Sequence, residues 1–278
     1  MTPAAELEPA AIAAGALHRL GVLKGAKQGS AFTSDLSVNE LLVVLEAGFR
    51  PVGLVLGSSV YHVGSQSRSW RVNQELDVLS HALTQARELA MTRMRTQAKG
   101  LNADGIVGMR LETRADYFGS ENAEFIAIGT AVKAEPRAGG GKRNWRTHTG
   151  QPFTSNLSGQ DFCALIRGGY APLGMVVGSC VYHIAHQQLK QVIANLGRNA
   201  EIEPVTRAMY DARELAMSRL HAATKALQAD GIVGMELTQH SHSWDSHTTE
   251  FLAVGTAIRP LRDDHQIERP AMVLSLDR

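Results

Sequence analysis

The chain contains one stretch twice, and this repeat constrains its fold more than any other feature. Residues 51–63 return as residues 172–184, with the shared pattern Pro-x-Gly-x-Val-x-Gly-Ser-x-Val-Tyr-His. Farther along, residues 103–109 return as residues 229–235 in the form Ala-Asp-Gly-Ile-Val-Gly-Met. Two copies of one domain therefore make up most of the 278 residues, which is enough chain for each copy to bury its own core.

The charge of the chain is balanced. Its 28 lysines and arginines nearly equal its 27 aspartates and glutamates, so the formal net charge is +1. This balance lacks the electrostatic footprint of proteins that bind nucleic acid or anionic membranes. No basic segment precedes the Ala-rich run near the N-terminus, and no apolar stretch reaches about 18 residues. We therefore expect a cytoplasmic protein without a membrane span.

Each copy predicts an α+β domain with the order β-α-β-β after a short entry helix. Capping boxes at Ser37–Glu40 and Ser158–Asp161 predict entry helices over 38–47 and 159–167. In the first copy we then expect a buried strand that begins near Val52, a long amphipathic helix over 72–101 and two strands over 106–111 and 124–132. In the second copy the same elements are expected from Leu173, over 201–227, and over 232–237 and 250–258.

Glycines recur at equivalent places inside the first strand of each copy, at Gly53 and Gly57 and at Gly174 and Gly178. Such positions favour a bulge or a close approach of two backbones. Pairing and chirality rules favour a small antiparallel-rich sheet with the long helix across one face. A three-stranded sheet covered on one face leaves an open face and unpaired edges, so we expect the domains to oligomerise.

These elements divide the chain into an N-terminal arm at 1–31, a first repeat at 32–133, a linker at 134–151, a second repeat at 152–259 and a tail at 260–278. Three consecutive glycines in the linker are typical of an exposed segment. In the tail, Met272, Val273 and Leu274 are apolar and favour an added strand on a neighbouring copy or on the same chain. A frayed terminus is the alternative.

The order of the repeated motifs resembles a known family. A strand with Gly-Ser precedes a helix with Ala-Arg-Glu-Leu-Ala, which is followed by Ala-Asp-Gly-Ile-Val-Gly and by Gly-Thr-Ala, over residues 50–133 and 171–259. This order is similar to that of the YbjQ-like family, also called UPF0145 or DUF74. The resemblance implies two tandem dodecin-like β-α-β-β domains, pentameric rings and the heavy-metal-binding label of that family.

A heavy-metal site needs ligands, and the sequence has no CxxC or HExxH spacing. The best local cluster is His240, His242 and His247, because alternate residues of an extended segment point to one face. The first repeat has other residue types at these positions, which favours a solvated loop as the alternative. The two cysteines, Cys163 and Cys180, occur only in the second repeat and are expected to be reduced, half-buried packing residues.

Two histidines and two charged pairs are common to both copies. His62 and His183 follow Tyr61 and Tyr182 at the ends of the first strands; they can gather around a ring axis or form hydrogen bonds at an interface. The pairs on the long helices are either solvated or form intersubunit ion pairs that fix the register of a ring. The pairs are Arg87 with Glu88 and Arg213 with Glu214.

The duplicated features are packing features, and no Ser-His-Asp or Cys-His set recurs. We therefore predict a structural self-assembling protein rather than an enzyme, whose domains form rings, pentameric by the resemblance, that can join into a double ring or a closed protein cage. The alternative is a protein that binds a heavy metal or a small ligand. No cofactor is expected apart from such a transition metal, and the expected partner is the protein itself rather than nucleic acid or a membrane.

Overall fold

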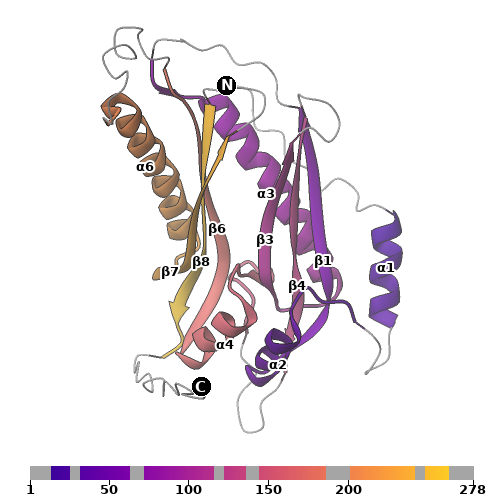
Figure 1. The fold of residues 1–278 in the computed structure, drawn as a ribbon. Helices are drawn as coiled ribbons and strands as arrows, with labels where there is room; N and C mark the ends of the chain where they lie inside the picture. The colour runs from indigo at the N-terminus through magenta and orange to yellow at the C-terminus, as the bar shows by residue number, and fades with distance from the viewer. Residues whose placement is uncertain are drawn as a thin grey trace, which may run out of the picture.

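The computed structural model describes residues 14–25, 32–62, 72–115, 122–135, 144–185, 201–241 and 248–262. In these residues the protein is a mixed α+β structure with two four-stranded sheets (Figure 1). The α+β fold class predicted from the repeat is thereby confirmed.

Apart from the short strands β2 and β5, the two repeats have matching elements. Those of the first repeat are α2 (Val38–Glu46), β1 (Phe49–His62), β2 (Gln74–Glu75), α3 (Asp77–Gly100), β3 (Gly105–Ala115) and β4 (Asn122–Ala134). Those of the second are β5 (Phe153–Thr154), α4 (Gly159–Arg167), β6 (Tyr170–His183), α6 (Glu203–Ala226), β7 (Gly231–Ser241) and β8 (Thr248–Pro260). A further helix, α1 (Ala14–Gly25), precedes the first repeat.

The entry helices α2 and α4 begin after the predicted serines. Ser37 Oγ accepts a hydrogen bond from the Glu40 amide at 3.3 Å, and Glu40 Oε2 accepts one from the Ser37 amide at 2.8 Å, which completes a capping box. Ser158 Oγ likewise accepts from the Asp161 amide at 3.1 Å. Because Asp161 is one methylene shorter than glutamate, its carboxylate accepts from the Ser158 hydroxyl at 2.7 Å instead of from the backbone.

The glycines that recur in both repeats let each long helix lie directly on its sheet. A Cβ atom on Gly57 would lie 2.1 Å from the Ala90 carbonyl oxygen, and one on Gly178 would lie 2.1 Å from that of Ala216. The antiparallel register also shifts just after the proline near the start of β1 and of β6. The predicted close approach and the predicted bulge are therefore both confirmed.

Each sheet takes its fourth strand from the other repeat, which the sequence did not predict. β2 pairs antiparallel with β6, with Glu75 opposite Tyr182, and β5 pairs parallel with β3, with Phe153 opposite Gly105. The strand orders are β1-β4-β3-β5 and β2-β6-β8-β7. The expectation of three-stranded sheets was therefore wrong. So was the predicted helix start at residue 72, because residues 74–75 are extended and α3 begins at Asp77.

The two domains stack in one direction. One face of α3 packs on the first sheet, and the same core cluster includes Met175 and Val181 from β6 of the second sheet. Figure 1 shows α6 on the side of the second sheet that faces away from the first domain. The layers therefore follow the order first sheet, α3, second sheet, α6.

Two further expectations concern burial. Cys163 and Cys180 are free thiols, exposed by only 4% and 0%, so they are fully buried rather than half-buried. Among the described residues, the model contains no helix with the length and apolar character that a membrane span requires.

Candidate functional site

The candidate functional site is the joint between the two repeats, where α3 meets the face of the second sheet that α6 does not cover. Its centre is an ion pair between Arg87 on α3 and Glu250 on β8. The two guanidinium nitrogens donate to the two carboxylate oxygens at 2.6 and 2.9 Å, and the side chains are 1% and 0% exposed. The guanidinium also lies 5.0 Å from the centre of the Phe125 ring. This bidentate geometry fixes the position of one domain on the other.

The start of α3 is also hydrogen-bonded to β6 of the second sheet. The amide of Leu76 donates to the carbonyl oxygen of Val181 at 2.9 Å, and the amide of Val181 donates to Ser80 Oγ at 2.8 Å. A second ion pair crosses the joint at 2.6 Å, from Arg219 on α6 to Glu75 on β2. Backbone hydrogen bonds and charged side chains thus both hold the two domains together.

The segment that contains β5 lies between the two sheets. Its side chain Phe153 is fully buried and belongs to a cluster of aromatic rings with Phe49, Trp145 and Phe162. A Cβ atom on Gly105 would lie 2.1 Å from the Phe153 ring, so only glycine at that position leaves space for the phenylalanine. The segment is therefore built into the core of the first repeat.

The entry helices contact each other at one end of the joint. Glu40 Oε1 accepts from the Gly159 amide at 3.1 Å, and Arg167 donates to Glu46 at 2.6 Å. Burial acts to raise the pKa of the Glu40 carboxyl, but the hydrogen bonds from Ser37 and Gly159 outweigh it and hold that pKa below its usual value. The capping residue of α2 thus also holds α4.

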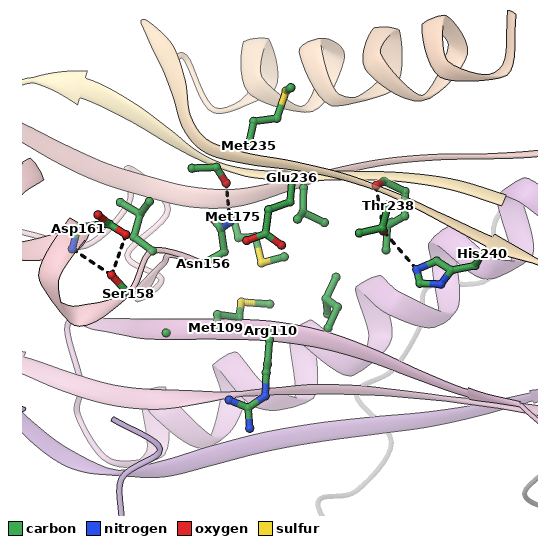
Figure 2. A pocket seen from close by; sticks show the side chains of 16 residues that line it. Met109, Arg110, Asn156, Ser158, Asp161, Met175, Met235, Glu236, Thr238 and His240 are labelled. Carbon is green, nitrogen blue, oxygen red and sulfur yellow. Dashed lines mark hydrogen bonds between the residues drawn. The ribbon is translucent and has the colours of Figure 1, made fainter. Parts of the chain in front are cut away.

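A cavity of about 590 Å³ lies in the joint between β3 and β7 (Figure 2). Figure 2 shows Met109, Met175 and Glu236 pointing into it, whereas Met235 and Arg110, which also border it, point away from it on the far sides of their strands. Among the described residues, no group of three or more His, Cys, Asp or Glu side chains is placed to hold a metal ion. The chemical character of the cavity is therefore that of soft thioethers with charged groups at its edge.

The predicted metal ligands that the structure describes lie in different environments. His183 is fully buried at the end of β6, whereas the equivalent His62 is exposed, with its Nδ1 3.3 Å from Asn122 Oδ1. His240 lies exposed on β7, its Nε2 3.2 Å from Thr238 Oγ1, and lines the cavity. His242 and His247 lie outside the described residues, so the predicted cluster stays a prediction.

The predicted interface residues also fall into different environments. Arg87 lies in the joint, but its sequence neighbour Glu88 is exposed, as is the equivalent Glu214. Tyr182 pairs through its backbone with β2, and Tyr61 is half-buried at the end of β1. The apolar tail residues Met272, Val273 and Leu274 lie outside the described part of the chain.

One residue of the joint was not identified from the sequence. Glu250 is the partner of Arg87, and its signal was present, because the dipeptide Glu-Phe recurs at 124–125 and 250–251.

Cys180, predicted to be a packing residue, is a buried thiol that packs with the alanines of α6 and lies close to Glu75. Burial, with a further contribution from that carboxylate, raises the pKa of the Cys180 thiol to about 12. The thiol is thus protonated at neutral pH and packs as an apolar side chain.

Known proteins match this chain either over most of its length or over about a third of it. The chain matches the YbjQ family model, described as "putative heavy-metal-binding", over residues 56–135 and 170–260. An encapsulin nanocompartment protein of Mycobacterium tuberculosis is 46% identical over 246 residues, which cover 88% of this chain and 92% of that protein. UPF0145 proteins of Clostridium novyi and Thermus thermophilus are 39% and 37% identical over 30% and 36% of this chain, and 82% and 96% of their own lengths. Since the family model matches more than half of the chain, once in each repeat, this chain belongs to the YbjQ-like family, with two tandem domains.

Proposed function

We propose that this protein is the subunit of a self-assembling protein shell, whose domains form rings. The similarity over nearly its whole length to an encapsulin nanocompartment protein supports this function. The short family members match only about a third of the chain, whereas this relative carries the same tandem arrangement. The physiological role is then structural rather than enzymatic.

The stacking of the two domains is the structural observation that carries the proposal. α3 covers the outer face of the second sheet, but no described element of the second repeat covers the outer face of the first sheet. The two surfaces of the joint are thus different patches, which is a heterologous contact, and heterologous contacts generate rings or open filaments when they repeat. The domains would be dodecin-like units, and their rings pentameric, as the family resemblance implies.

The mass of the purified native protein tests this function. Light scattering, with negative-stain images of the same fraction, is expected to give particles far larger than one 30.0 kDa chain, with ring-shaped views or closed shells. A monomer or dimer at working concentration would contradict the proposal.

The alternative function is binding of a heavy metal or small ligand, and the cavity into which Met109 and Met175 point is the observation that favours it. Thioether ligands suit soft ions such as Cu(I). Metal analysis of protein purified without chelators tests this alternative, with titration of Cu(I) into the apoprotein. A silent titration and no bound metal would remove it.

A further inference from the structure

The ion pairs that join the two domains within one chain have exact counterparts in the repeat, and the counterparts are split between the two ends of the molecule. Arg87 corresponds to Arg213 on α6, and Glu250 corresponds to Glu124 on β4. Arg213 makes ring contacts with Tyr210 and Phe251, as Arg87 does with Phe125, but in the described residues it has no carboxylate partner. Half-buried Glu124 makes no ion pair there either.

The second ion pair of the joint is duplicated in the same way. Glu75 and Arg219 correspond to Glu201 and Arg93. Arg219 donates both to Glu75 and to the carbonyl oxygen of Ser179, and Arg93 donates to the equivalent carbonyl oxygen, that of Ser58. Both charges of each pair are therefore kept in the copy where no neighbouring domain is present. A merely solvated helix face gives no reason to keep them.

The burial of the two first strands differs in a way that only a missing neighbour explains. On the outer face of β6, Val181 is fully buried by α3. The equivalent Val60 on β1 is 51% exposed. On the helix side, Leu76 at the start of α3 is 5% exposed and its equivalent Ile202 is 40% exposed. Apolar side chains are thus exposed to solvent both on the outer face of the first sheet and at the start of α6.

The strand exchanged at the joint is also present twice. Phe32 and Thr33 correspond to Phe153 and Thr154 of β5, but Phe32 is 43% exposed whereas Phe153 is fully buried. Phe153 packs over Gly105, so the expected packing position of Phe32 is over the equivalent glycine, Gly231 at the start of β7. A Cβ atom on Gly231 would meet only Ile258, at 3.7 Å, so the space above this glycine is open.

We propose that a second copy of the chain repeats the internal joint between molecules: its first sheet docks on α6, its Phe32–Thr33 segment adds a parallel strand to β7 over Gly231, and its Glu124 pairs with Arg213. This inference rests on the proposed shell function and names the contact that closes the ring. A second copy of the chain would cover the exposed apolar faces, complete the two charge pairs and place Phe32 over Gly231. Repetition of this contact alternates first and second repeats around one ring.

The entry helices agree with this alternation. Glu46 and Arg167 occupy equivalent positions and pair within the chain. In an alternating ring, each Arg167 lies next to Glu46 of its own chain and near Glu46 of the next chain, whereas contacts between like repeats would oppose equal charges. Val38 stands where Gly159 does, so its helix must sit slightly farther from α4 than α2 and α4 sit within one chain.

Charge reversal on the full-length protein tests the joint. The single variants Arg213→Glu and Glu124→Arg are expected to lose the particle and give species of one or two chains, because each buries a repulsive pair. The double variant restores the opposite charges and is expected to recover the particle. Arg207→Glu is the matched control on α6, because its equivalent, His81, stays exposed in the internal joint. Circular dichroism of each variant verifies that it is folded.

A disulfide trap gives an independent readout. The double variant Phe32→Cys with Gly231→Cys is expected to form intermolecular disulfides, seen on a non-reducing gel as a ladder beyond the dimer, because the contact is heterologous. Particles that survive both single charge reversals, or a trap that stops at dimers or gives none, would overturn the joint and leave the shell function standing. A wild-type protein of 30.0 kDa in solution would instead contradict the shell function itself.

Discussion

A buried arginine paired with a buried glutamate holds the two domains in register. Loss of either charge leaves the other uncompensated in the core, so Arg87→Met is expected to lower the free energy of unfolding by about 3–5 kcal/mol. The double variant Arg87→Met with Glu250→Leu replaces the pair by apolar side chains and is expected to recover most of that loss. Urea denaturation at one protein concentration measures both. A loss in the double variant equal to the sum of the losses in Arg87→Met and Glu250→Leu would show that the pair is not coupled.

Glu40 makes the joint sensitive to acid. Its pKa in the folded protein is below the usual value of 4.5, so its contribution to stability is present above that value and is lost as the pH falls through the folded pKa. Between about pH 6 and about pH 3, the stability advantage of the wild type over Glu40→Gln is expected to shrink toward zero. Denaturation curves of the two proteins across this range measure it. If the stability difference between wild type and Glu40→Gln does not change with pH, the charge of Glu40 does not contribute to it.

At the scale of elements, the same substitution at two equivalent glycines is expected to act on different properties, on the stability of the chain at one and on assembly at the other. Gly105→Ala places a methyl group within the buried Phe153 ring, so it should destabilise the chain by about 1–3 kcal/mol and separate β5 from β3. Gly231→Ala meets open space and should leave the stability of the single chain unchanged while it prevents assembly. Thermal unfolding and light scattering of both variants measure the two effects. A stable Gly105→Ala protein would contradict the packing described for β5.

The elements that the sequence predicted well are those whose signals are local. The serine caps fixed the starts of α2 and α4, and the repeated Gly57 and Gly178 marked the approach of a helix to its sheet. The exchanged strands β2 and β5 could not be predicted, because two residues have no periodicity and their pairing is decided by the other repeat. The partner of Arg87 was visible only as a repeated Glu-Phe dipeptide, whose meaning needs the stacking of the domains.

At the scale of the whole molecule, a joint that alternates the repeats closes only on a whole number of chains. Every ring then contains an even number of domains, so the five-domain ring that the family resemblance implies would need a different contact, whereas a ring of five chains would hold ten domains. In the Phe32→Cys with Gly231→Cys variant, mass spectrometry without reductant is expected to find a covalently closed ring whose mass is a multiple of 30.0 kDa, because each first repeat is then linked to the second repeat of the next chain. A ring that contains only one kind of repeat would require a different contact.

The tail after residue 262 lies outside the described residues, and in the sequence residues 271–278 include the apolar stretch Met272–Leu274. If the tail adds a strand to a neighbouring ring, its deletion should leave rings intact but separate them from one another. The expected product of the truncation at residue 270 is therefore a folded, ring-sized particle in place of the native one, with the Arg213 and Glu124 pair still required for it. Light scattering and negative-stain images of the truncated protein measure this. An unchanged particle mass would show that the tail is not an assembly element and that rings join through surfaces of the folded domains alone.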